Sequence, residues 1–183
     1  MRIILANPRG FCAGVNMAID CVDRVLELRG APVYVYHQIV HNRHVVQGFE
    51  RRGVVFVDHV EQVPPGSVLV YSAHGVSPAV RQAARERSLI EIDATCPLVT
   101  KVHVEVLRFA KDGYTTIFVG HRNHDEAVGT VGEAPNSIVV VESVADALAV
   151  KVPNPDKVAF VTQTTLSVSE ASDIITALRQ RFP

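Results

Sequence analysis

Short apolar segments alternate along the chain with longer segments in which apolar residues recur every three to four positions. The long segments have the period of an amphipathic helix, and the short ones have the length and β-branched composition of buried strands. Gly30, Gly53 and Pro64-Pro65-Gly66 lie between them, where such residues end helices or form turns. The pattern predicts strands at residues 2–6, 33–36, 54–57, 68–71, 89–92, 115–119, 138–141 and 158–162. It predicts helices at residues 14–29, 41–52, 78–87, 97–113, 143–149 and 167–181, the last capped by Ser167 with Glu170 completing a capping box.

Strands that alternate with helices indicate an α/β fold with mostly parallel sheets. The alternation begins again near residue 96, and each half holds about four predicted strands. We therefore expect two similar small α/β domains, the first spanning residues 1–96 and the second residues 97–183. No low-complexity linker separates them, so the two domains are expected to pack closely.

Composition narrows the class of protein further. The 183 residues are 48% hydrophobic and 20% charged, which is enough apolar material for a packed core. The formal net charge is −1, so a basic nucleic-acid-binding surface is not expected. No apolar run reaches the roughly 18 residues of a membrane span. The first apolar run breaks at Pro8, too early for a signal peptide. We therefore expect a cytoplasmic protein without a membrane partner.

Chemically reactive side chains follow the predicted strands, where ligands bind to open α/β sheets. These residues are Cys12, His41, His74, Cys96, His124 with Glu126, and Thr164 beside Gln163. Because they all lie just beyond the carboxyl ends of strands, the pattern predicts that they share one face.

Cys12 and Cys96 each lie between a strand end and a helix start, where a helix N-terminus stabilises a thiolate. Free cysteines are more often small buried hydrophobes, and this interpretation is favoured for Cys21, which lies within a helix. The odd cysteine count argues against a disulfide framework. Residues alone thus predict a thiolate-bound metal centre beside a histidine-rich anion pocket. A zinc site and a Cys–His nucleophilic hydrolase fit the same residues. His37, His44, His59 and His103 are interpreted as structural.

Several segments resemble the hydroxymethylbutenyl diphosphate reductase family, and the similarity runs over the whole chain. They are Ala6-Asn7-Pro8-Arg9-Gly10-Phe11-Cys12-Ala13-Gly14, Val40-His41-Asn42, Ser72-Ala73-His74-Gly75, Asp93-Ala94-Thr95-Cys96-Pro97, Gly120-His121-Arg122-Asn123-His124-Asp125-Glu126 and Thr162-Gln163-Thr164-Thr165.

The resemblance implies an iron–sulfur oxidoreductase. Its family ends the non-mevalonate route to isoprenoids by reducing (E)-4-hydroxy-3-methylbut-2-enyl diphosphate to isopentenyl and dimethylallyl diphosphates. The family has three similar α/β domains around a [4Fe–4S] cluster, with one cysteine ligand in each, and an external one-electron donor such as ferredoxin or flavodoxin. The resemblance implies that Cys12 and Cys96 are two cluster ligands and that His41, His74 and His124 contact the diphosphate. It also implies that Glu126 delivers a proton and that Thr164 bonds the substrate hydroxyl region.

The same resemblance places the third cysteine and the third domain beyond Pro183. We therefore expect this chain to correspond to the N-terminal two-thirds of such a reductase. Two thiolates do not reproduce the usual cluster ligation, so a non-catalytic diphosphate-binding fragment of two domains is the alternative hypothesis.

Overall fold

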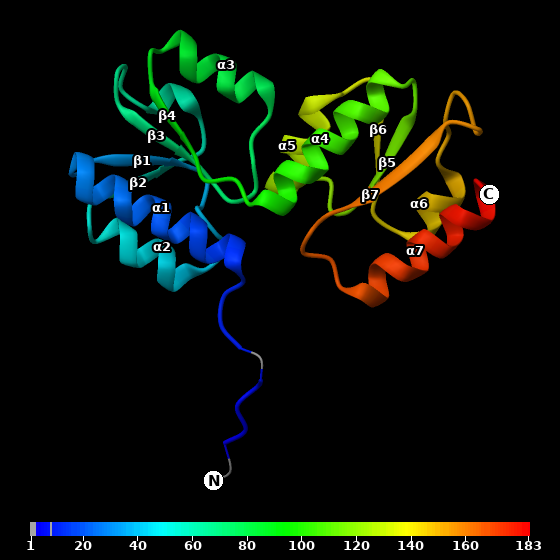
Figure 1. The fold of residues 1–183 in the computed structure, drawn as a ribbon, viewed down its shortest axis with the longest axis horizontal. Helices are drawn as coiled ribbons and strands as arrows, with labels where there is room; N and C mark the ends of the chain where they lie inside the picture. Colours follow the sequence, from blue (N-terminus) through cyan, green and yellow to red (C-terminus); the bar gives the residue numbers. More distant parts are fainter. Residues whose placement is uncertain (1–2, 8) are drawn as a thin grey trace.

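Two parallel β-sheets organise the computed structural model, which describes residues 3–7 and 9–183 (Figure 1). The first sheet has the strand order β2-β1-β3-β4, and the second has the order β6-β5-β7. The first comprises β1 (Val33–Tyr36), β2 (Val54–Val57), β3 (Val68–Tyr71) and β4 (Ile90–Asp93). The second comprises β5 (Thr115–Val119), β6 (Ile138–Val141) and β7 (Val158–Thr162). The α/β class is confirmed, although the described residues give the second sheet three strands instead of about four.

Helices cover both faces of each sheet. In the first half they are α1 (Ala13–Arg29), α2 (Arg43–Glu50), the short 3₁₀ helix η1 (Val60–Gln62) and α3 (Pro78–Glu86). In the second half they are α4 (Pro97–Lys111), α5 (Asp125–Glu133), α6 (Val144–Ala149) and α7 (Val168–Arg181). None of these helices is long and apolar enough to span a bilayer. The predicted Ser167 cap of α7 is confirmed, because the Ser167 hydroxyl accepts a hydrogen bond from the Glu170 amide. The predicted capping box is not formed, since the Glu170 side chain accepts from the Ser167 hydroxyl and not from its backbone N–H.

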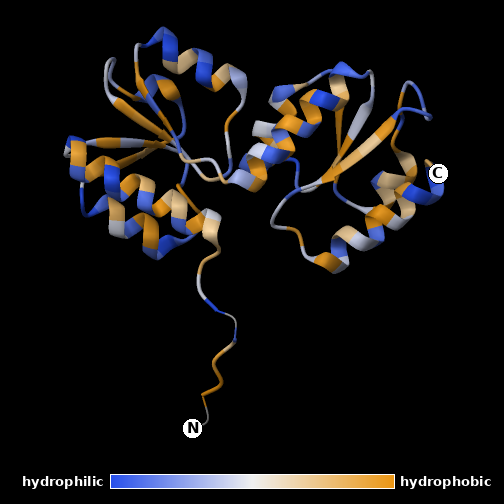
Figure 2. Ribbon diagram, in the orientation of Figure 1, coloured by the Kyte–Doolittle hydropathy of each residue, from blue (hydrophilic) through white to orange (hydrophobic). Residues whose placement is uncertain are grey.

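The first sheet has a core on each face. On one face, Ala18, Val22 and Val25 lie one helical turn apart on α1 and pack against the β-branched side chains of β1. On the other face, α3 and η1 cover Leu69 and Tyr71 of β3. Each fully buried valine or leucine stabilises the fold by roughly 1.5–3 kcal/mol. Figure 2 shows the apolar residues concentrated in the strands and along the helices beside them.

The second sheet repeats this arrangement, with α6 and α7 on one face and α4 and α5 on the other. Each hydrophobic cluster of the described residues lies within one half of the chain. We therefore propose that the domain boundary lies between β4 and α4. The two halves meet at α5, where a Cβ on Gly132 would lie 2.3 Å from the Ser77 Cβ and a Cβ on Gly129 would lie 3.2 Å from the Gly75 carbonyl oxygen.

The predicted strand at residues 2–6 is wrong for its described part, residues 3–6, and its first residue lies outside the described residues. Ile3, Ile4 and Leu5 are 71%, 78% and 67% exposed, and their segment runs away from both sheets (Figure 1). An apolar run has strand propensity, but a strand also needs a hydrogen-bonding neighbour. The other seven strands are confirmed to within one residue. The helix predicted at 41–52 is shorter at both ends: the Asn42 side chain caps α2 before Arg43, and the chain turns after Glu50.

Candidate functional site

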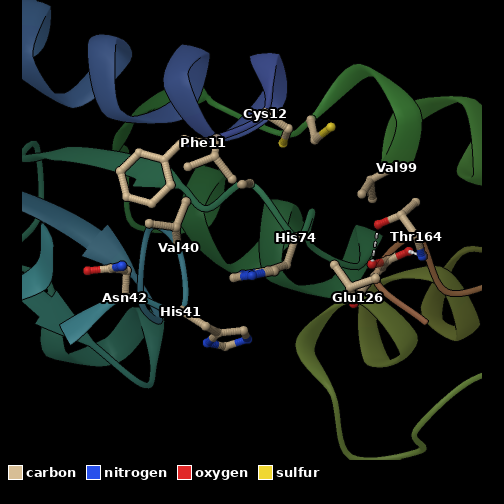
Figure 3. A pocket seen from close by; sticks show the side chains of 13 residues that line it. Phe11, Cys12, Val40, His41, Asn42, His74, Val99, Glu126 and Thr164 are labelled. Atoms are coloured by element: carbon tan, nitrogen blue, oxygen red, sulfur yellow. Dashed lines mark hydrogen bonds between the residues drawn. The ribbon is translucent and has the colours of Figure 1, made fainter. Parts of the chain in front are cut away.

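A cavity of about 280 Å³ lies between the two halves of the molecule (Figure 3). Its apolar wall comes from Phe11, Val15, Val40, Ala73 and Val99. Its reactive side chains are six of the seven predicted site residues, Cys12, His41, His74, Cys96, Glu126 and Thr164. The structure thus brings the predicted residues together, and His124 joins them through ring contacts with His41 and His74.

Sheet topology explains this convergence. In the first sheet, β1 lies next to β3, and the connections that follow these two strands run in opposite directions, to β2 and to β4, so that a crevice opens between their carboxyl ends. His41 follows β1 and His74 follows β3, at the two sides of this crevice. In the second sheet β5 lies between β6 and β7, and Glu126 and Thr164 follow β5 and β7. The cavity forms where these two crevices face each other.

Cys12 and Cys96 occupy the N-cap positions of α1 and α4. Both thiols line the cavity, although Cys12 follows an extended segment and not the predicted strand. The two helix starts approach closely, since a Cβ on Gly14 would lie 2.4 Å from the Cys96 Sγ. Cys21 packs against the core of the first half, where burial and the charge of Asp93 raise the pKa of its thiol. This position agrees with the structural interpretation of Cys21.

Three histidine rings form one cluster at the cavity. The rings of His41 and His74 stack with centroids 4.2 Å apart, and His124 meets them edge-on at 5.1 and 5.4 Å. One ring nitrogen from each lies within 4.8 Å of the others, close enough for all three to contact one phosphate group or one metal ion.

Hydrogen bonding favours an anion over a metal at this cluster. The Nδ1 atom of His124 accepts the backbone N–H of Glu126 at 3.1 Å, so the Nε2 atom carries the ring proton. A protonated nitrogen donates to an anion but has no lone pair for a metal. Burial, reinforced by the charge of His41, lowers the pKa of His74 to about 4 and also lowers the pKa of His124. Near neutral pH these two rings are therefore neutral hydrogen-bond donors.

Glu126 is the most enclosed carboxyl group at the cavity, with 1% of its surface exposed. It accepts two hydrogen bonds from Thr164, from the backbone N–H at 2.7 Å and from the hydroxyl at 2.8 Å (Figure 3). Burial raises the pKa of Glu126, and the bonds from Thr164 partly oppose this rise. A carboxyl group with a raised pKa can hold a proton closer to neutral pH and release it to a ligand.

Sequence reasoning missed one pair beside the cluster. His37, interpreted as structural, bonds through Nδ1 to the Oδ1 atom of Asp125 at 2.7 Å, across the boundary between the halves. The position of His37 directly after β1 could have marked it as a candidate site residue from the sequence. Its partner Asp125, 88 residues away, could not have been predicted from local patterns. His103 is buried and bonds Glu133 at 3.0 Å, as expected of a structural residue.

The fold and the site define a class of protein, a two-sheet α/β protein with a histidine-rich pocket beside two cysteines. The family model described as "LytB protein" matches residues 3–183. The chain therefore belongs to the LytB family.

Similar sequences and solved structures extend this result. The chain is 58% identical over 183 residues to a 4-hydroxy-3-methylbut-2-enyl diphosphate reductase of Rhodopirellula baltica and 55% identical over 182 residues to that of Mycolicibacterium paratuberculosis. It spans 57% and 55% of their lengths. The solved structure of the E-1-hydroxy-2-methyl-but-2-enyl-4-diphosphate reductase from Plasmodium falciparum aligns with a TM-score of 0.93 at 47% identity, over 97% of this chain and 56% of that one. A second reductase structure, described as the terminal enzyme of the non-mevalonate pathway, aligns with a TM-score of 0.81 at 31% identity, over 98% of this chain and 64% of that one.

Proposed function

We propose that this chain forms two of the domains of a reductase that converts (E)-4-hydroxy-3-methylbut-2-enyl diphosphate to isopentenyl and dimethylallyl diphosphates. The observation that carries the proposal is the single cavity that gathers two thiols, three imidazoles and the Glu126–Thr164 pair. The family membership and the names of the relatives support it. The proposed compartment is the cytoplasm, where thiols stay reduced.

The two cavity thiols suit an iron–sulfur cluster. Cys12 and Cys96 lie at helix N-termini, which stabilise thiolates, and the neighbouring wall is apolar. A [4Fe–4S] cluster needs more cysteine ligands than these two, and Cys21 is held in the core of the first half. We propose that the chain supplies two ligands and that a further cysteine belongs to the part of the enzyme that its longer relatives contain. When bound, the cluster would pass electrons from ferredoxin or flavodoxin and act as a Lewis acid toward the substrate hydroxyl.

The imidazole cluster is the proposed diphosphate site. His41, His74 and His124 present ring nitrogens within 4.8 Å of one another, matched to the oxygens of one phosphate group. The apolar wall beside them suits the five-carbon chain of the substrate.

Glu126 and Thr164 are the proposed proton-handling pair. The reaction takes up two electrons and two protons, breaks the carbon–oxygen bond and releases the hydroxyl as water. Glu126 would donate a proton to the departing oxygen, and the Thr164 hydroxyl would orient the substrate there. Because burial raises its pKa, Glu126 holds a proton to a higher pH than an ordinary carboxyl group.

A second candidate function follows from the shortage of thiols. Among the described residues only Cys12 and Cys96 line the cavity, so the chain by itself can bind a diphosphate without reducing it. Zinc at the imidazole cluster has less support, because His124 Nδ1 accepts the backbone N–H of Glu126 and its Nε2 atom then carries the ring proton.

One experiment separates these functions. The 183-residue chain is reconstituted anaerobically with iron and sulfide, and three quantities are measured: iron and sulfide per chain, substrate binding by calorimetry, and turnover with reduced viologen. Bound cluster with turnover, lost in Cys12→Ser but kept in the control Cys21→Ser, supports the reductase. Saturable substrate binding without iron or turnover supports the second candidate. A folded chain that binds no substrate overturns both.

A further inference from the structure

A carboxylate stands beside the anion pocket, where its charge opposes a bound diphosphate. Asp125, the first residue of α5, directs its Oδ2 atom toward the pocket, 3.9 Å from His41 Nε2 and 3.9 Å from His74 Nδ1. Its side chain is 22% exposed, so solvent screens this charge only in part. For an anion to bind here, a favourable effect of this carboxylate must offset its repulsion of the ligand.

The other carboxylate oxygen joins the two halves of the molecule. Asp125 Oδ1 lies 2.7 Å from His37 Nδ1, and this bond links α5 of the second half to the end of β1 in the first. His37 is held firmly, because its ring stacks on Tyr36 at 4.2 Å and its backbone N–H donates to Val57 at 2.8 Å. Its φ of 55° is uncommon for a residue other than glycine, and such backbones cluster where a side chain must be aimed.

The bond joins two elements that carry residues of the pocket. His124 immediately precedes Asp125 and belongs to the second half, whereas His41 and His74 belong to the first. The edge-on contact of His124 with the other two rings therefore depends on where α5 begins relative to β1. Asp125 is the residue that ties those two points together through a side-chain bond.

We propose that Asp125 is a positioning residue of the diphosphate pocket, which assembles the three-histidine cluster across the two halves through His37. This inference rests on the proposed diphosphate site and adds a residue to it. A carboxylate facing imidazoles favours their charged form, which in turn attracts the ligand. The repulsion between Asp125 and the ligand is thus offset by the geometry that its bond to His37 gives the pocket.

The surroundings of His37 allow this role to be measured. The bond to Asp125 raises the pKa of His37, against the effect of burial, and Asp58 contributes in the same direction. The titratable groups that face Asp125 or His37 are Tyr36, His41, Asp58, His74 and His124.

The test uses inorganic pyrophosphate and this chain without metal. Asp125→Asn keeps the shape and a hydrogen-bonding group but removes the charge, and His37→Gln breaks the same contact from the other side. We expect pyrophosphate to bind about tenfold more weakly to each variant at pH 7, which equals about 1.4 kcal/mol. The double variant should bind pyrophosphate only slightly more weakly than either single variant, because both substitutions remove the same contact. The pKa of His37, followed by NMR of its ring protons, should fall in Asp125→Asn. Asp156→Asn, in the exposed loop before β7, is the control.

Opposite results separate the possible failures. If Asp125 only repels the ligand, Asp125→Asn will bind pyrophosphate as tightly as the unmodified chain or more tightly, and the proposal is overturned. An unmoved pKa of His37 overturns it as well. If the unmodified chain itself binds no pyrophosphate, the proposed diphosphate site fails instead.

Discussion

The hydroxyl of Thr164 provides a measurable test of the buried carboxyl group. Thr164→Val replaces the hydroxyl by a methyl of similar size and removes the 2.8 Å bond to Glu126 Oε2. The backbone N–H of residue 164 still reaches Oε1 at 2.7 Å, so the carboxylate keeps one of its two donors. The substitution therefore isolates one hydrogen bond to a nearly fully enclosed group.

The expected magnitude follows from the charge of the acceptor. Hydrogen bonds to charged groups contribute about 1.5–3 kcal/mol, and an ionised carboxylate 1% exposed has little water to replace a lost donor. We expect the free energy of unfolding to fall by about 2 kcal/mol at pH 8, where Glu126 is more fully ionised than in acid. The loss should be smaller at pH 4.5, because the raised pKa of Glu126 leaves much of it protonated there.

Urea denaturation at both pH values measures this difference. Thr176→Val, on the exposed side of α7, is the matched control and should change the unfolding free energy little. Equal losses at pH 8 and pH 4.5 would show that the hydroxyl does not act on a carboxylate. No loss at either pH would show that water or another donor replaces it.

Two further predictions concern a close contact and a charge pair. Gly14→Ala should lower the melting temperature and change the alkylation rate of Cys96, because the added Cβ would lie 2.4 Å from the Cys96 Sγ. Gly48→Ala, whose Cβ meets open space, should raise the melting temperature. Equal increases in melting temperature in both variants would contradict the contact. The raised pKa of His37 means that its protonated form stabilises the fold below its usual pKa of about 6.5, and that this contribution is lost as the pH rises through the raised value. The stability difference between the unmodified chain and Asp125→Asn should therefore shrink between pH 6 and pH 9, and a constant difference would refute this.

Local patterns in the sequence predicted most elements because the signals are themselves local. The strands are short β-branched runs, and Ser167 caps its helix through an amide three residues away. The candidate residues were found by the same reasoning, since the carboxyl ends of parallel strands meet at one edge. The prediction failed at residues 3–6, because hydrophobicity does not supply a pairing partner.

The long-range contacts of the site were not predictable from local patterns. The bond between His37 and Asp125 joins residues 88 positions apart and depends on how the two halves dock. Glycines at the meeting surface, such as Gly132 against Ser77, have no hydrophobic period that would mark them as contact residues.

The hydrophobic clusters of the described residues each lie within one half, and the halves meet through glycines and a few polar bonds. Stability within each half therefore does not by itself hold the pocket together. A ligand that contacts both halves must draw on the fraction of molecules in which they are docked, and its apparent affinity is reduced by that fraction. Substitutions at this meeting surface can thus weaken binding without touching the ligand, and any partner that clamps the halves together will tighten it.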